Sequence, residues 1–165
     1  DPVMVSKGGA KLIDSTPIQT LKKKLLKNVL LITPNIPEAE ILAETSIKNK
    51  EDMIFAANNV GSEMCIRDRL KGGHLKSKKV IDLYFNKSDF KVFTSFRHRT
   101  KNTHGTGCTL SSAIATFLSC GKSIKSACAL GIKYVNSAIL TNPNYGKGHG
   151  PINHVNSMKI KQKFN

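Results

Sequence analysis

Short apolar runs alternate along the chain with longer stretches in which apolar residues recur at helical spacing. Residues 29–32 are continuously apolar, as in a strand that is buried on both faces. Residues 80–85 and 90–96 are rich in β-branched and aromatic residues and flank a polar connection, which predicts a hairpin or two neighbouring strands. The alternation as a whole predicts an α/β domain with a parallel sheet covered by helices.

Helical spacing is clearest in the second half of the chain. The apolar residues after Gly107 predict one helix that stops at Gly121, where glycine suits a helix end. A second helix is predicted over residues 123–140. Its stripe on one face comprises Ile124, Ala127, Cys128, Gly131, Val135, Ala138 and Ile139.

Two helix starts are predicted in the first half. Thr16 has the position of an N-cap, with proline at the first helical position and Gln19 closing a capping box. The second start follows Asn35, directly after the apolar run, and Glu38 lies in its first turn, where the helix dipole favours an acid.

Composition narrows the class of protein. With 165 residues and 39% hydrophobic content, the chain can form one domain with a core. No run reaches the roughly 20 apolar residues of a membrane span, and the first ten residues lack a secretion signal, so we expect a cytoplasmic protein without a membrane partner. The four cysteines form no C-x-x-C pair, which argues against structural zinc and disulfides.

The net charge of +15 raises the possibility of nucleic-acid binding. Apart from residues 22–24, however, the lysines are scattered, and no basic motif interleaved with aromatic residues is present. We therefore expect no nucleic-acid partner. The charge is typical of a solvated, lysine-rich surface that also favours a polyanionic substrate such as ATP.

The strongest local signal is residues 102–109, Asn-Thr-His-Gly-Thr-Gly-Cys-Thr, which lead into the helix after Gly107. Gly105 and Gly107 allow a tight turn whose N–H groups converge, and the helix dipole adds about half a positive charge there. A phosphate or a developing oxyanion would be stabilised at this point. The dipole would also favour a thiolate at Cys108. A plain glycine loop that caps a helix remains the alternative.

Two further motifs have both a chemical and a structural interpretation. Asn35 and Glu38, three positions apart at the carboxyl end of a strand, could hold magnesium through bound water, or could simply cap a helix. Lys71, in Lys-Gly-Gly-His, could contact a phosphate or belong to a turn between strands. His149, in Gly-His-Gly-Pro, is by default a loop histidine.

Taken in order, five motifs resemble the series found in the phosphomethylpyrimidine kinases of the ribokinase-like superfamily. They occupy residues 1–4 (Asp-Pro-Val-Met), 33–40 (Thr-Pro-Asn-Ile-Pro-Glu-Ala-Glu), 71–74 (Lys-Gly-Gly-His), 103–110 (Thr-His-Gly-Thr-Gly-Cys-Thr-Leu) and 146–154 (Gly-Lys-Gly-His-Gly-Pro-Ile-Asn-His). Together they cover nearly the whole chain. The resemblance implies a ribokinase-like α/β fold with a mostly parallel central sheet and helices on both faces.

The implied activity is transfer of the ATP γ-phosphoryl group to 4-amino-5-hydroxymethyl-2-methylpyrimidine, and then to its monophosphate, in thiamine diphosphate biosynthesis. By the same resemblance Gly105, Thr106 and Gly107 form an anion hole, and Cys108 has the position of the catalytic base. Such a transfer needs mainly positioning and charge stabilisation.

The resemblance also assigns roles in the first half of the chain. It makes Lys71 the lysine that contacts phosphate, and Glu38 with Asn35 the anchor for magnesium-bound water. Asp1 is the acidic residue beside the phosphates. The implied ligands are thus ATP, Mg²⁺ and a small pyrimidine, and a homodimer is an open expectation.

The sequence departs from the family in two respects. The family has a long segment before Asp-Pro-Val-Met that supplies most pyrimidine contacts, so we expect residues 1–165 to be a partial kinase domain, which by itself could be inactive. The strand expected just before Lys71 should be apolar, yet Arg67, Asp68 and Arg69 occupy it, and burying unpaired charges costs several kcal/mol. Residues 60–70 also resemble a translated sequencing adapter, which suggests a foreign or misread segment.

Other functions remain open at this point. Pyridoxal kinases share the Asp-Pro-Val-Met, Thr-Pro-Asn and Gly-Thr-Gly elements, whereas the Gly-His-Gly-Pro-Ile-Asn-His run at 148–154 favours the pyrimidine substrate. A non-catalytic nucleotide-binding fragment is the alternative outside the enzymes.

Overall fold

The computed structural model describes residues 1–5, 11–64, 67–72, 79–86, 89–141, 143 and 145–155, with only the backbone at 15, 62–64, 67–69 and 89. It divides into two compact units, residues 1–96 and 97–165, and each is described by itself. Gly73 and His74 of the Lys-Gly-Gly-His motif lie outside the described residues, as does Cys65 of the suspected segment.

The first unit begins its helical structure two residues earlier than predicted. Helix α1 spans Ser15–Thr20 and continues into a wider turn, η1 (Leu21–Leu25), and a tight turn, η2 (Leu26–Asn28). The N-cap prediction for Thr16 was wrong, because Asp14 is the last residue with an extended backbone and helical geometry starts directly after it.

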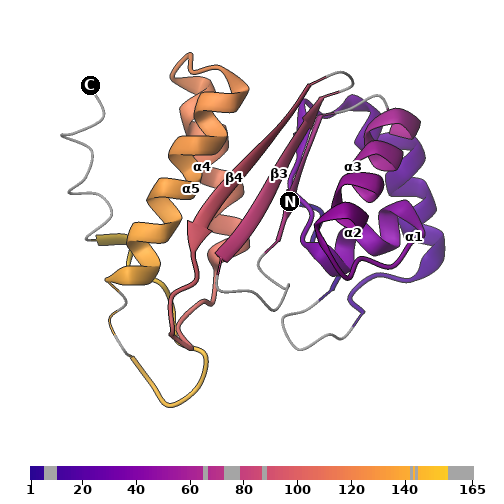
Figure 1. The fold of residues 1–165 in the computed structure, drawn as a ribbon. Helices are drawn as coiled ribbons and strands as arrows, with labels where there is room; N and C mark the ends of the chain where they lie inside the picture. Colours follow the sequence, from indigo (N-terminus) through magenta and orange to yellow (C-terminus); the bar gives the residue numbers. More distant parts are fainter. Residues whose placement is uncertain are drawn as a thin grey trace. The chain divides into compact units, whose positions relative to one another are not determined.

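The predicted strand after residue 28 and the predicted helix after Asn35 follow next. Strand β1 is limited to Leu31–Ile32, and helix α2 (Ile36–Ala43) starts after Asn35. Helix α3 (Lys50–Met64) then leads to strand β2 (Arg67–Lys71). Helix α3 packs against β2 and β3 (Lys79–Asn86), and α2 packs against α3 and β2, so these helices cover the sheet. Figure 1 shows this layering within the first unit.

The sheet has the strand order β1-β2-β3-β4, with β4 spanning Asp89–Phe96. Among the described strands only β1 and β2 pair in parallel, so the described part of the sheet is not the mostly parallel one that we expected, because the hairpin and its neighbour β2 pair antiparallel. The predicted hairpin is formed by β3 and β4, whose antiparallel register runs from Lys79 opposite Phe96 to Asn86 opposite Asp89. Strand β2 is also antiparallel to β3, and Leu70 lies opposite Leu83.

The backbone of the charged residues 67–69 forms the first part of β2, which is an interior strand of this sheet. Arg67 pairs with Leu31 of β1, and Asp68 and Arg69 pair with Phe85 and Tyr84 of β3. The strand expected before Lys71 is therefore present. The foreign origin of residues 60–70 stays a prediction, since the side chains at 67–69 are outside the description.

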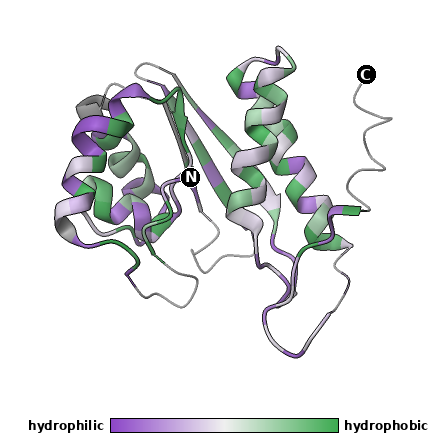
Figure 2. Cartoon of the chain, turned by 180° about the vertical axis from the view of Figure 1, so that it is seen from behind, coloured by the Kyte–Doolittle hydropathy of each residue, from purple (hydrophilic) through white to green (hydrophobic). Residues whose placement is uncertain are grey.

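Two apolar clusters make up the core of the first unit. One joins the start of the chain to the helices and β1, and the other lies between α2, α3 and the sheet. Their buried members are Met4, Leu26, Ile32, Leu42 and Val60 in the first, and Ile36, Ala39, Ile47, Met53, Ala56, Leu70 and Leu83 in the second. Hydrophobic and hydrophilic residues are mixed along each helix in Figure 2, as expected for helices with one buried face.

The second unit is built on a helix pair. Helices α4 (Thr106–Ser119) and α5 (Ile124–Leu140) pack against each other. Five residues of the predicted α5 stripe are buried: Ala127, Cys128, Gly131, Val135 and Ala138. Gly131 allows close approach, because a Cβ there would lie 2.9 Å from Ile114 Cγ1 of α4. No described helix is long and apolar enough to cross a membrane.

Candidate functional site

The turn after β1 is fixed by a reciprocal pair of hydrogen bonds. Asn35 Oδ1 accepts from the Glu38 backbone N–H at 2.9 Å, and Glu38 Oε2 accepts from the Asn35 N–H at 2.8 Å. This is a capping box, with proline in the first turn, and it satisfies donors that the helix start would otherwise leave without partners. The helix-capping interpretation of Asn35 and Glu38 is therefore confirmed, and their role at a metal stays a prediction.

Glu38 also reaches the first segment of the chain. Its Oε1 accepts from the Met4 backbone N–H at 3.3 Å, and the residue is only 2% exposed. Both carboxylate oxygens thus receive backbone donors. Since an ionised carboxylate offers about four lone-pair sites, acceptor capacity remains for water.

Lys71 lies where β2 ends beside the turn after β1. Its backbone N–H donates to the Pro34 carbonyl at 2.9 Å, which extends the parallel pairing to Asn35. Its Nζ lies 2.7 Å from Asp1 Oδ1, and Thr33 Oγ1 donates to the same oxygen at 3.4 Å. The carboxyl ends of two parallel strands and the start of the chain therefore meet at one lysine–carboxylate pair.

Gly72 and Asp82 support this arrangement and were missed by sequence reasoning. A Cβ on Gly72 would lie 1.8 Å from the Ile81 carbonyl oxygen, so only glycine fits between β2 and β3. The Gly72 N–H donates to Asp82 Oδ1 at 3.0 Å, and Asp82 is 7% exposed. Asp82 could have been recognised in the sequence as an acidic residue within an otherwise apolar strand. A carboxylate buried there needs hydrogen-bond partners.

The first unit thus brings together four predicted site residues: Asp1, Asn35, Glu38 and Lys71. Among the described residues no group of three or more His, Cys, Asp or Glu could hold a metal ion directly. The donors fit magnesium through water only, since this ion usually keeps several waters and takes one or two carboxylates.

In the second unit the glycine turn has the predicted form. Gly105 is the N-cap residue of α4 with φ = 82°, a left-handed conformation that favours glycine. The Thr103 carbonyl accepts from Thr106 Oγ1 at 2.7 Å, which fixes the start of the helix. Gly107 and Cys108 lie in the first helical turn, whose N–H groups have no acceptor within the helix. Cys108 is a free, exposed cysteine.

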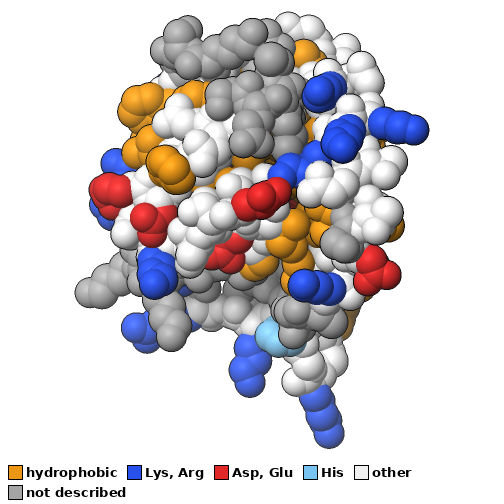
Figure 3. Space-filling model, turned by 90° about the vertical axis from the view of Figure 1, so that its right-hand side faces the viewer, with side chains coloured by type: hydrophobic (Ala, Val, Ile, Leu, Met, Phe, Trp, Pro, Cys, Tyr) orange, Lys and Arg blue, Asp and Glu red, His pale blue; other side chains and the backbone are white. Residues whose placement is uncertain are grey.

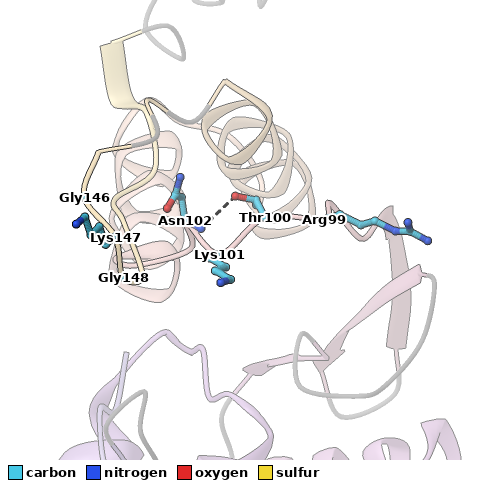
Figure 4. A pocket seen from close by; sticks show the side chains of 7 residues that line it. All are labelled: Arg99, Thr100, Lys101, Asn102, Gly146, Lys147 and Gly148. Carbon is cyan, nitrogen blue, oxygen red and sulfur yellow. Dashed lines mark hydrogen bonds between the residues drawn. The ribbon is translucent and has the colours of Figure 1, made fainter.

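A pocket of about 370 Å³ lies in the second unit between residues 99–102, which precede this turn in the sequence, and residues 146–148. Figure 4 shows Asn102 between the two segments, with its backbone N–H bonded to Thr100 Oγ1. Arg99, Lys101 and Lys147 line the pocket, although the Arg99 side chain extends away from Asn102. These residues were not predicted as site residues.

The charge is divided unequally along the chain. All 11 Asp and Glu residues lie within residues 1–96, and residues 97–165 contain none. The face shown in Figure 3 has acidic and basic side chains interspersed. The glycine turn and the pocket therefore belong to a purely basic unit, which raises the local concentration of anions.

Comparisons with known proteins agree with these motifs. The family model described as phosphomethylpyrimidine kinase matches residues 1–153. The thiamine biosynthesis bifunctional protein of Geobacter sulfurreducens is 45% identical over 155 residues, covering 94% of this chain and 32% of that protein. The hydroxymethylpyrimidine/phosphomethylpyrimidine kinase of Bacillus subtilis is 38% identical, covering 93% of this chain and 57% of that protein. The chain thus spans little more than half of that relative.

Solved structures show the same fold. The phosphomethylpyrimidine kinase of Clostridium difficile has a TM-score of 0.72 at 37% identity, covering 84% of this chain and 55% of that one. The pyridoxal kinase of Staphylococcus aureus in complex with ADP has a TM-score of 0.89 at 31% identity, covering 97% and 58%. These likenesses confirm the α/β class and the ribokinase-like fold. With the family model matching almost the whole described chain, this protein belongs to the phosphomethylpyrimidine kinase family.

Proposed function

We propose that the protein of which this chain is part transfers the γ-phosphoryl group of ATP to 4-amino-5-hydroxymethyl-2-methylpyrimidine and to its monophosphate, in thiamine diphosphate biosynthesis. The observation that carries the proposal is the Gly105 turn at the start of α4, in a chain that the family model matches over residues 1–153. The substrate class follows from the known relatives, which are named for thiamine biosynthesis and for phosphorylation of hydroxymethylpyrimidine and phosphomethylpyrimidine.

The glycine turn would stabilise the transferring phosphoryl group. Backbone N–H groups of Gly107 and Cys108 point out of the first turn of α4, and the helix dipole adds positive potential there. Groups that are fixed before charge develops stabilise a transition state without reorganisation. The basic surroundings of the second unit favour the polyanionic nucleotide.

Cys108 would serve as the base. In the proposed step the hydroxymethyl oxygen forms a bond to the γ-phosphorus while the bond to the β,γ-bridging oxygen breaks. The hydroxyl proton passes to the Cys108 thiolate, and ADP leaves. The exposure of Cys108 at the start of α4 supports this role.

Lys71 would bind a phosphate oxygen of the nucleotide, and Asp1 would hold its ammonium group in place beforehand. The Asp1–Lys71 distance of 2.7 Å supports this orienting role. Magnesium, when bound, would neutralise phosphate charge. Glu38 and Asp1 are the carboxylates that could hold its water ligands.

Pyridoxal phosphorylation is the second candidate. The observation in its favour is that pyridoxal kinase structures of Staphylococcus aureus have TM-scores of 0.85–0.89, above the 0.72 of the Clostridium difficile phosphomethylpyrimidine kinase. The sequence comparisons favour the pyrimidine, since the similar curated relatives carry that name.

The test is a competition assay with a protein that contains this chain at the full length of its relatives. ATP is supplied with equal concentrations of the hydroxymethylpyrimidine and pyridoxal, and the phosphorylated products are separated by mass. We expect the pyrimidine monophosphate and then the diphosphate, with kcat/KM for the pyrimidine exceeding that for pyridoxal. Phosphorylation of pyridoxal alone, or of neither acceptor, would overturn the proposal.

A further inference from the structure

Asn102 is a buried polar residue to which the proposed reaction assigns no task. It is 6% exposed, and its Oδ1 accepts from the Gly150 backbone N–H at 3.0 Å. A buried amide of this kind needs hydrogen-bond partners, and one of its partners is the backbone of a loop 48 positions further along the chain. The contact therefore joins the segment before the glycine turn to the C-terminal loop.

Gly150 is fitted closely against this side chain. A Cβ at position 150 would lie 2.5 Å from Asn102 Oδ1 and 2.7 Å from the Tyr145 carbonyl oxygen. The Gly150 carbonyl in turn accepts from the His104 N–H at 3.1 Å, and His104 forms a parallel bridge with Pro151. Two hydrogen bonds thus hold the loop directly beside the residue that precedes Gly105.

The other end of the same loop is fastened to α5. The Asn153 N–H donates to the Ala138 carbonyl at 2.9 Å, and its Nδ2 donates to the Thr141 carbonyl at 2.8 Å. Since α5 packs against α4, the loop ties residues 102–104 to the same helix pair that α4 belongs to. The glycine turn is held from both sides, by α4 that follows it and by the loop that anchors its approach.

We propose that Asn102 and Gly150 form a clamp through which residues 145–153 hold the Gly105 turn in its anion-binding conformation. Asn102 is thereby a positioning residue for phosphoryl transfer, and the proposal rests on the proposed function. The physical reason is preorganisation: N–H donors stabilise a transferring phosphate only if their directions are fixed in advance. Gly105, with its left-handed backbone, gives the turn freedom that its neighbours must restrict.

The chain offers a matched pair of variants. Gly150→Ala places a methyl group against Asn102 Oδ1. Tyr145→Ala, five residues earlier in the same loop, removes a side chain that is 70% exposed and does not line the pocket. Asn102→Ala is a second variant that cannot clash. It removes the acceptor and leaves the Gly150 N–H buried without this partner.

Two readouts separate positioning from folding. Hydrogen exchange followed by mass spectrometry reports local opening of residues 103–109, compared with the middle of α4 and α5 in the same sample. Binding of a non-hydrolysable ATP analogue, and the kcat and KM for ATP, are measured well below the unfolding midpoint of each variant. A purely structural role would lower that midpoint without changing the affinity of the folded protein for the analogue.

We expect Gly150→Ala and Asn102→Ala to speed exchange at residues 103–109 and to weaken binding of the ATP analogue by about tenfold, the scale of one lost buried hydrogen bond. Tyr145→Ala should match the unsubstituted protein in both readouts. Unchanged exchange at 103–109 in Asn102→Ala, or faster exchange with unchanged affinity for the analogue, would overturn the clamp. If neither the unsubstituted protein nor any variant phosphorylates the pyrimidine while exchange and analogue binding respond as expected, the proposed function fails and the clamp stands.

Discussion

Lys71 Nζ lies 2.7 Å from Asp1 Oδ1, an ion pair between residues 70 positions apart whose side chains are 13% and 11% exposed. The pair joins the end of β2 to the start of the chain. A lysine held in this way has a defined position before any anion arrives, and its carboxylate partner balances its charge in the meantime.

Replacing Lys71 should weaken nucleotide binding. For Lys71→Met we expect the Kd for ADP to rise by about 10- to 100-fold, the range for losing one charge-assisted hydrogen bond. Titration calorimetry would measure it. Lys48→Met, at an exposed position of the same unit, removes the same charge and is the control. Equal losses in both variants would mean that Lys71 acts only through net charge.

Asp1→Asn should destabilise the first unit, because it leaves the largely buried Lys71 ammonium group without its carboxylate. We expect a loss of about 2–4 kcal/mol in the free energy of unfolding, measured in urea. The double variant with Lys71→Met should recover part of that loss, since it also removes the ammonium group that has lost the Asp1 carboxylate. An additive double variant would contradict the coupling.

Glu38→Gln should affect both stability and magnesium dependence. The Met4 and Asn35 N–H groups donate to different oxygens of the Glu38 carboxylate, and glutamine replaces one of these oxygens by an NH₂ donor, so one N–H would face a donor instead of an acceptor. We expect a loss of about 1–3 kcal/mol in unfolding free energy.

The magnesium role of Glu38 needs a separate measurement on the folded variant. The magnesium concentration for half-maximal rate should rise in Glu38→Gln and stay constant in Glu51→Gln, an exposed acid in the first turn of α3. If only stability changes, Glu38 is a capping residue and nothing more.

Cys108→Ala should lower kcat by about 10²- to 10³-fold, the usual contribution of one catalytic group. Cys120→Ala is the matched control, because Cys120 is also a free, exposed cysteine and lies at the other end of α4. Steady-state rates with saturating ATP would compare the two. Unchanged kcat in Cys108→Ala would exclude it as the base.

This chain spans only part of the length of its relatives, which leads to a further prediction. Because the chain spans 57% of the Bacillus subtilis kinase, we expect a chimaera that carries the rest of that relative to phosphorylate the pyrimidine at least about 100-fold faster than residues 1–165 alone. Equal rates would show that this chain holds all groups needed for catalysis.

The origin of residues 60–70 can be tested by peptide mapping of protein from the source organism. If the segment is foreign, no native peptide should contain Met64–Cys65–Ile66–Arg67, and an apolar strand should replace it. Recovery of that peptide would establish the charged β2 strand as native.

The sequence by itself determined the elements whose signals are local. The β3–β4 hairpin, both helices of the second unit and the capping box at Asn35 and Glu38 follow from side-chain periodicity and from contacts three or four positions apart. Such signals depend only on neighbouring residues, so they can be recognised without knowing how the rest of the chain folds. The α1 start was misjudged by two residues, since helical geometry begins directly after Asp14 although this residue makes no side-chain capping hydrogen bond.

The tertiary structure alone decided which distant groups meet. The pairs Asp1–Lys71, Met4–Glu38, Gly72–Asp82 and Asn102–Gly150 are separated by 10 to 70 positions. No periodicity or spacing encodes such a pair, because its distance depends on strand order, register and the path of the loops. Motif resemblance could name Lys71 as a ligand, but only the folded sheet gives it the carboxylate that holds its ammonium group in place.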